Sequence, residues 1–320
     1  MEVVFLSLGD WANIGSHLAE SLRRVGVKAK SWASWHLKMD YPIKSNVYTD
    51  WEEVKEDTEK AKVVWLMHGN VFKHRTPYWR RDQIICAWHG GPPLLQMSEE
   101  RSTISQDFFG RYLRRDLHPI HFIQHPRLYD NCYFLERKYL LSPPVDTERL
   151  QPTYYNRSKL VIGHFPRNTG TGLITKGHDK VVNVLSYVNG NFSTCIDTKF
   201  IDWDSHIRRI DKCDIYVEKL SVVLREWGMT ALEAAALGKI VIGQFDNRET
   251  YEKYYGQSPM LTANTETELK EVLYNISTWG RGRILHHQKL TRAWAEKYHS
   301  FEAVGRRLKN ILIKEGATIG

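Results

Sequence analysis

Short apolar runs alternate with stretches of helical periodicity along the whole chain. Five apolar runs in the first half predict buried strands, and they span residues 3–8, 28–33, 63–67, 83–88 and 120–123. The periodic stretch 16–25 predicts a helix that stops at Gly26. Continuous apolar strands that alternate with helices are typical of a parallel sheet covered on both faces.

Pro143 and Pro144 interrupt this pattern, because neither can continue a helix or a central strand. The alternation then restarts, with predicted strands at 160–164, 193–196, 214–217 and 240–242 and predicted helices at 176–188, 203–210, 229–237 and 266–274. Residues 281–310 are predicted to form one or two helices.

The pattern therefore predicts an α/β fold of two Rossmann-like domains that face a central cleft. The first domain is residues 1–143, and the second is residues 144–300. Residues 301–320 form a closing helix that could pack back on the first domain. Ligands of such sheets bind beyond the carboxyl ends of the strands.

Composition narrows the class of protein. Hydrophobic residues make up 42% and charged residues 26%, which excludes a disordered or fibrous chain. No apolar run approaches the ~18 residues of a membrane-spanning helix, and the N-terminus does not have the pattern of a signal peptide. The four cysteines form no Cys-x-x-Cys pair, so reduced thiols and a cytoplasmic location are expected, with peripheral membrane association left open.

The net charge of +8 suits an anionic ligand, an anionic membrane surface or nucleic acid, and does not choose among them. Residues 107–117 combine arginines with aromatic side chains, so they could contact a membrane, a lipid-linked acceptor or DNA. The alternative is a helix whose apolar face lies on the core. The spacing of His118, His121 and His125 fits no zinc motif, so no metal site is predicted.

The most informative segment is a loop, a helix and a strand around Gly228. This glycine allows close approach of a ligand, and the amides of Met229 and Thr230 at the helix start favour an anion such as a diphosphate. Glu226 and Glu233 are two helical turns apart, so both could face the cleft and accept hydrogen bonds from sugar hydroxyls. The alternative is an ordinary amphipathic helix with an acid near its start.

This segment resembles the C-terminal signature of family 4 glycosyltransferases, which are retaining enzymes of the GT-B fold. Other segments agree in order. Residues 144–152 are similar to the interdomain linker of that family, and residues 161–166 to the first strand of its donor domain. Residues 211–217 are similar to the strand before the signature, and residues 293–312 to the closing helices. The resemblance covers residues 140–312 well and the first half only in layout.

The resemblance implies that Glu233 binds the ribose and that Glu226 contacts hydroxyls of the donor sugar. One departure matters, because the family usually has seven residues between the two glutamates and this chain has six. When the alignment is anchored on Gly228 and Glu233, Arg225 fills the first glutamate position. Either Glu226 or Arg225 therefore serves there, and Arg225 could contact phosphate.

Further site residues follow from the same resemblance. Lys176 and Arg167 are expected to bind the diphosphate, and Gly15 belongs to a strand-to-helix loop over the reacting sugar and the acceptor. His89 follows an apolar strand and is expected beside the donor sugar, with His68 as its competitor. The alternative is a plain turn for the loop with Gly15, a solvated loop cation for Lys176 and Arg167, and a structural side chain for the histidines. The predicted catalytic group is His89, Glu226 and Lys176.

The resemblance implies a retaining, metal-independent glycosyltransferase of the hexosyltransferase type without a cofactor. Its donor would be a nucleoside-diphosphate sugar, with UDP favoured, and its acceptor a hydroxyl of a glycan or lipid-linked saccharide. Three alternatives stay open. They are a DNA-modifying glycosyltransferase that acts on a hydroxylated base, a sugar-nucleotide epimerase or phosphorylase, and a non-catalytic module that binds sugar or nucleic acid.

Overall fold

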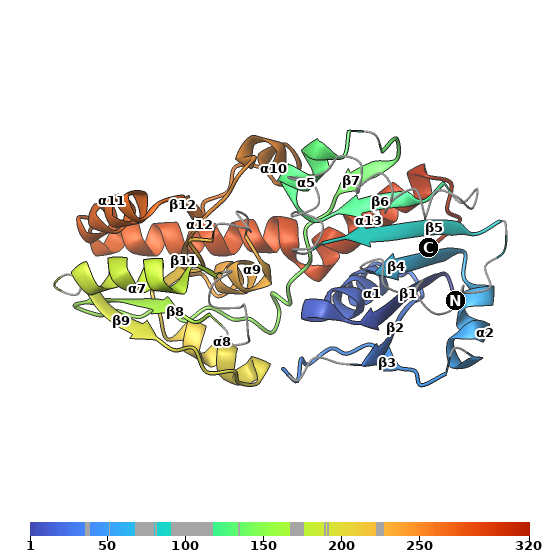
Figure 1. Cartoon of the computed structure of the whole chain (residues 1–320), viewed down its shortest axis with the longest axis horizontal. Coiled ribbons are helices and arrows are strands. Elements are labelled where there is room, and N and C mark those ends of the chain that lie inside the picture. Colours follow the sequence, from blue (N-terminus) through green and yellow to red (C-terminus); the bar gives the residue numbers. More distant parts are fainter. Residues whose placement is uncertain are drawn as a thin grey trace. The chain divides into compact units, whose positions relative to one another are not determined.

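The structure is a computed structural model of the 320-residue chain. It describes residues 1–35, 39–50, 52–67, 80, 82–90, 118–133, 135–166, 176–188, 190, 192–221 and 227–320. The chain divides into two compact units (Figure 1). Unit 1 is Met1–Pro144 with Ser300–Gly320, and unit 2 is Val145–His299.

Unit 1 contains a seven-stranded sheet in the order β3-β2-β1-β4-β5-β6-β7, and every neighbouring pair is parallel. The strands are β1 (Val3–Gly9), β2 (Ala29–Trp35), β3 (Asn46–Val47), β4 (Val63–Met67), β5 (Ile84–His89), β6 (Ile120–Ile123) and β7 (Lys138–Leu140). The described helices are η1 (Trp11–Asn13), α1 (Ile14–Arg24), α2 (Glu52–Lys60), α5 (Pro126–Asn131) and α13 (Phe301–Lys314). Such a sheet with helices is Rossmann-like.

Both faces of the unit 1 sheet are covered, as the continuous apolar strands predict. Side chains of β1 alternate between two cores, because successive residues of a strand point to opposite faces. Val3 and Phe5 join a core with α1 and α13, whereas Val4 and Leu6 join a core with Val54 of α2. All four β1 side chains are fully buried.

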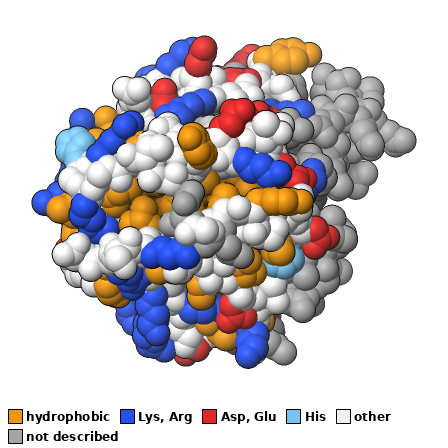
Figure 2. Space-filling view, turned by 90° about the vertical axis from the view of Figure 1, so that its left-hand side faces the viewer, with side chains coloured by type: hydrophobic (Ala, Val, Ile, Leu, Met, Phe, Trp, Pro, Cys, Tyr) orange, Lys and Arg blue, Asp and Glu red, His pale blue; other side chains and the backbone are white. Residues whose placement is uncertain are grey.

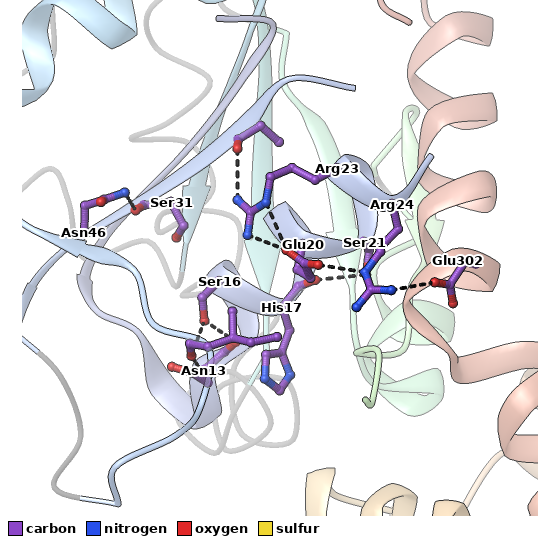
Figure 3. Close-up of polar contacts among 12 residues, drawn as sticks. Asn13, Ser16, His17, Glu20, Ser21, Arg23, Arg24, Ser31, Asn46 and Glu302 are labelled. Atoms are coloured by element: carbon purple, nitrogen blue, oxygen red, sulfur yellow. Dashed lines mark hydrogen bonds and ion pairs between the residues drawn. The ribbon is translucent and has the colours of Figure 1, made fainter. Parts of the chain in front are cut away.

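Helix α13 packs very closely on α1. A Cβ atom at Gly305 would lie 2.0 Å from the backbone oxygen of Ser21, so the contact requires glycine. Polar contacts flank it. Glu20 pairs with Arg23 and Arg24 of its own helix, and Arg24 also reaches Glu302 of α13 at 3.5 Å (Figure 3).

Unit 2 contains a five-stranded parallel sheet in the order β12-β11-β10-β8-β9. The strands are β8 (Leu160–His164), β9 (Phe192–Ile196), β10 (Ile215–Val217), β11 (Ile240–Gly243) and β12 (Leu261–Thr262). The described helices are α7 (His178–Tyr187), α8 (Trp203–Asp211), α9 (Met229–Ala236), α10 (Arg248–Tyr255), α11 (Glu266–Ser277) and α12 (Arg281–His299). β10 lies in the centre of the sheet, and its three residues are fully or almost fully buried.

A buried arginine fixes the C-terminal end of α9. Arg292 of α12 donates hydrogen bonds to the carbonyls of Ala236 in α9 and of Leu150 in the segment that follows the two prolines. It also donates to the carbonyl of Thr147 at 2.7 Å. The bond to Ala236 satisfies a carbonyl that a helix end leaves without a partner, and the other two connect this end of α9 to residues 147–150 through Arg292.

The two parallel sheets confirm the predicted α/β class. The segment predicted as one or two helices, 281–310, is two. They separate at Ser300, whose hydroxyl accepts a hydrogen bond from the amide of Ala303 and caps α13. Among the helices of the described ranges, none is long and apolar enough to cross a membrane.

The close contact of α13 with α1 generates a stability prediction. Gly305→Ala should lower the midpoint of thermal unfolding by about 3–10 °C, because overpacking costs about 1–3 kcal/mol. Gly282→Ala in α12 is the control, since a Cβ there meets no atom within 4 Å. Differential scanning calorimetry of both variants checks this, and equal midpoints would show that the helices separate without cost.

Candidate anion-binding site

A buried carboxylate lies where β10 ends and α9 begins. Glu218 follows β10 directly, and its side chain is fully buried. Its Oε1 atom accepts hydrogen bonds from Nζ of Lys176 and from the amide of Gly228, both at 3.0 Å. Nζ of Lys219 lies 3.6 Å from the same oxygen. One carboxylate thus holds a lysine before α7 and the amide of the residue that precedes α9.

Backbone hydrogen bonds fix the position of this carboxylate. The amide of Glu218 donates to the carbonyl of Ile242 and so continues the ladder between β10 and β11. The amide of Leu220 donates to the carbonyl of Lys176 at 3.0 Å. Gly177 makes this approach possible, because its φ of 60° is left-handed and a Cβ would lie 2.0 Å from the oxygen of Leu220.

The electrostatics of this group favour an anion. Burial raises the pKa of Glu218, but the ammonium groups of Lys176 and Lys219 and the amide of Gly228 lower it by more, so the net shift is downward. Two ammonium groups, those of Lys176 and Lys219, lie within 4 Å of this one carboxylate. The N-terminus of α9 adds the partial positive charge of a helix dipole. Lys176 is partly exposed, so a ligand can reach its ammonium.

Two stacked histidines lie near this group, at the carboxyl end of β8. Nδ1 of His164 lies 2.9 Å from the carbonyl oxygen of Val217, so Nδ1 carries the proton and donates it. The rings of His164 and His178 stack with centroids 5.4 Å apart. Burial lowers the pKa of His164 to about 3, so its imidazole is neutral at physiological pH.

Glu233 lies further along α9 and is also buried. Nε1 of Trp203 donates a hydrogen bond to its Oε1 at 2.7 Å. Trp203 is the first residue of α8, and the Asp202 carboxylate caps that helix by accepting from the amide of Ser205. The carboxylate of Glu233 is therefore held in a fixed direction by a neighbouring helix.

In unit 1 the start of α1 already has an anionic partner. The Asp10 carboxylate accepts hydrogen bonds from the amides of Gly15 and Ser16 at 2.7 and 2.9 Å. It also accepts one from the hydroxyl of Ser45 at 2.8 Å. The amide of Gly15 thus already has an intramolecular acceptor.

The loop between β1 and α1 has an unusual backbone. Ala12 and Asn13 adopt left-handed φ angles of 51° and 61°, which cost conformational free energy for residues other than glycine. Asn13 and the Ser16 hydroxyl both reach the carbonyl of Ile43 (Figure 3). These hydrogen bonds help to hold the loop in its strained conformation.

His89 is the last residue of β5 and is buried in unit 1. Its Nε2 lies 2.9 Å from Nδ1 of His121 on the neighbouring strand β6, and the two rings stack. Burial lowers the pKa of His121 to about 4, so this ring is neutral at physiological pH. Over the part of the chain that the structure describes, no three His, Cys, Asp or Glu side chains could hold a metal ion together.

The structure brings together part of the predicted site. A Cβ atom at Gly228 would lie 3.9 Å from Nζ of Lys176, and Met229 and Thr230 follow in the same helix start. Five predictions lie outside the described residues, and they concern His68, Arg167, Arg225, Glu226 and the stretch 107–117.

Sequence reasoning missed Glu218, His164 and Trp203. Glu218 did carry a signal, because it is an acidic residue directly after a buried apolar strand and directly before Lys219. His164 and Trp203 gave none that separates them from ordinary buried side chains.

Positive charge is dispersed on the face that Figure 2 shows. Lys and Arg side chains occur over the whole of this face, with acidic and hydrophobic side chains between them. This dispersion agrees with the modest net charge of +8. On that face the basic side chains therefore single out neither a nucleic-acid nor a membrane partner.

Comparison with known proteins identifies the fold. No protein-family model matches the sequence, and no curated protein sequence matches it significantly. Solved structures do match. HepE of Anabaena in complex with UDP-glucose superimposes with a TM-score of 0.70 at 11% identity, covering 98% of this chain and 100% of that chain.

Two further structures agree. WaaG, a glycosyltransferase involved in lipopolysaccharide biosynthesis, gives a TM-score of 0.59 at 12% identity and covers 98% of this chain and 100% of its own. Sucrose-phosphate synthase from Thermosynechococcus elongatus gives 0.60 at 9% identity, with coverages of 98% and 99%. The chain therefore has the GT-B fold, with two Rossmann-like domains.

His164 generates a prediction on pH and stability. The unfolded chain binds a proton at this residue below about pH 6.5, whereas the folded chain does so only near pH 3. The stability that neutral His164 contributes is thus complete above pH 6.5 and is lost as the pH falls toward 3.

His164→Asn keeps a donor for the carbonyl of Val217 and removes the titration. The stability difference between wild type and variant should shrink by about 1.4 kcal/mol per pH unit between pH 6 and 4. Chemical denaturation at several pH values measures it. A difference that stays constant over this range would contradict the prediction.

Proposed function

We propose that this protein is a retaining glycosyltransferase that moves a sugar from a nucleoside-diphosphate sugar, with UDP favoured, to an acceptor hydroxyl. The observation that carries the proposal is the ammonium of Lys176 beside the N-terminus of α9. It lies in a fold shared with HepE, which has been solved with UDP and with UDP-glucose.

The diphosphate would bind at the Lys176 ammonium and the amides of Met229 and Thr230. The amide of Gly228 already donates to Glu218, so the next two amides of the helix start are the ones left for a ligand. An ammonium and a helix dipole together stabilise the charge that develops on the leaving diphosphate, so the proposed reaction needs no metal ion.

The nucleoside would extend along α9. Glu233 is the proposed ribose ligand, and the hydrogen bond from Trp203 supports this role by holding the carboxylate in place. Resemblance alone supports further contacts of Arg167 with the diphosphate, and of Arg225 or Glu226 with phosphate or sugar.

Unit 1 would supply the acceptor side. We propose His89 and the loop around Gly15 for contacts near the reacting carbon, and a glycan or lipid-linked saccharide as the acceptor. The paired, buried imidazoles of His89 and His121 favour positioning over base catalysis. The departing phosphate is then the group that takes the acceptor proton.

The free thiols of all four cysteines favour a cytoplasmic location.

Donor binding is the first prediction of this function. In a thermal-shift panel of UDP-, GDP-, ADP- and dTDP-sugars, one donor should stabilise the protein by about 2.7 kcal/mol at ~100 times its Kd. Lys176→Met should weaken that donor at least tenfold in calorimetric titration, since it removes a charge-assisted contact to phosphate. Lys180→Met, an exposed lysine on the next helical turn, is the matched control and should bind normally.

Product analysis then separates the reaction classes. A transferase forms free nucleoside diphosphate in step with a glycosylated acceptor. If the donor sugar is epimerised when no acceptor is present, the protein is a different enzyme with the same fold. No stabilisation by any sugar nucleotide, with Lys176→Met indistinguishable from wild type, would overturn the proposal.

A further inference from the structure

Several buried polar atoms near the Lys176 group have no hydrogen-bond partner among the residues that the structure describes, including Nε2 of His164 and Nδ1 of His178. Two others are Oε2 of Glu218 and Nε1 of Trp227. The Glu218 side chain is fully buried, and Trp227 is 6% exposed. The first atom can only accept a hydrogen bond while ionised, and the second can only donate one. Burying both without partners is unfavourable, so each is expected to meet a complementary group.

The two side chains lie close together beside Gly243, the last residue of β11. A Cβ atom built on Gly243 would lie 3.5 Å from Oε2 of Glu218 and 3.5 Å from Cδ1 of Trp227, the ring carbon bonded to Nε1. Because residue 243 is glycine, it places no side chain between the carboxylate and the indole ring. An acceptor and a donor therefore lie near one point at the carboxyl edge of the sheet.

Both groups are held in place. The Trp227 ring lies 3.9 Å from the Phe245 ring and meets Tyr251 edge-on, so its N–H has a fixed direction. Oε1 of Glu218 is engaged by Lys176 and Gly228, which fixes the direction of Oε2. A preorganised donor and acceptor recognise a ligand group at low entropic cost.

The chemistry of this pair selects a hydroxyl group. A hydroxyl accepts one hydrogen bond and donates another at a single oxygen, so it can bind the indole N–H and the carboxylate at once. A phosphate oxygen would be repelled by the carboxylate, and an ammonium cannot accept from the indole. The other oxygen of the same carboxylate touches the proposed diphosphate site, so the ligand carries its hydroxyl close to its phosphates.

We propose that Glu218 and Trp227 together bind one hydroxyl of the donor sugar and so determine which sugar is accepted. This inference rests on the proposed function. Glu218 then joins both halves of the donor. Oε1 holds Lys176 and the start of α9 in position for the diphosphate, and Oε2 binds the sugar hydroxyl.

The test is a cycle between protein variants and deoxy sugars. Binding affinities are measured for UDP, UDP-glucose and the monodeoxy analogues of UDP-glucose. If another sugar nucleotide stabilises the protein most in the thermal-shift panel, the corresponding set for that donor is used. Glu218→Gln should weaken the sugar nucleotide about 10–100-fold, because it exchanges the charged acceptor for a neutral amide. The free nucleoside diphosphate should bind no more weakly than to wild type, since a negative charge near the phosphates is removed. Trp227→Phe, which removes only the N–H and part of the ring, should also weaken the sugar nucleotide selectively.

One deoxy analogue should bind to the wild-type protein with the same reduced affinity that the parent sugar nucleotide shows for Glu218→Gln. The affinity of this analogue should not fall further in the variant. Asp214→Asn is the matched control. Asp214 is a fully buried carboxylate at the other end of β10, and its Oδ1 also has no partner within the described segments. This variant should leave both affinities unchanged within about twofold, as expected for a side chain outside the binding group.

The alternatives predict other results. If Glu218 only positions Lys176, the variant weakens the nucleoside diphosphate and its sugar derivative equally, and all deoxy effects are additive. If a water molecule binds the two groups instead, the deoxy analogues lose no affinity that depends on Glu218. Either result overturns the inference while the proposed function stands. Wild type that binds no sugar nucleotide ends both. Should Glu218→Gln fail to fold, Trp227→Phe carries the same comparison.

Discussion

The candidate site depends on a carboxylate that cannot be buried alone. Glu218 lies inside unit 2, where an isolated negative charge would be strongly unfavourable. Lys176, Lys219 and the amide of Gly228 compensate it, and each comes from a different point of the chain. The end of β10, the segment before α7 and the start of α9 are therefore held together by one charge. Removing Glu218 would leave the ammonium groups without their counter-charge, and removing the ammonium groups would leave the carboxylate without its own. The charges that hold this edge of the sheet together are therefore the same charges that could attract an anion.

The two units use the start of a helix in different ways. In unit 1, among the described residues, the Asp10 carboxylate accepts hydrogen bonds from two amides of α1 and the hydroxyl of Ser45, which are all neutral donors. The carboxylate thus compensates the partial positive charge of that helix start. In unit 2 the carboxylate at the helix start instead lies beside two ammonium groups.

The apolar pattern predicted nine of the strands that the structure describes, missed the three short strands β3, β7 and β12, and did not identify the site. The strands at 63–67, 120–123 and 160–164 have the predicted bounds, and the other predicted strands differ by one or two residues at an end. Elements missed were short or mostly polar, as in α2, where only Val54 and Thr58 are buried. Lys176 was predicted through resemblance, and a Cβ atom at Gly228 would lie 3.9 Å from its Nζ. Glu218 was missed because a single acid after a strand has many explanations, and only its two hydrogen-bond donors and the nearby Lys219 ammonium distinguish it.

The position of α13 has a consequence for the order of events during synthesis. Val304, Leu308 and Leu312 belong to the same buried core as Val3 and Phe5, so one face of the unit 1 sheet is completed only after α13 has been synthesised. Unit 2 is contiguous in sequence and has its own core. On the ribosome, unit 2 can therefore complete its fold while the earlier-made half still exposes an apolar face. The apolar face of the N-terminal half of a nascent chain would therefore stay exposed until α13 has been synthesised.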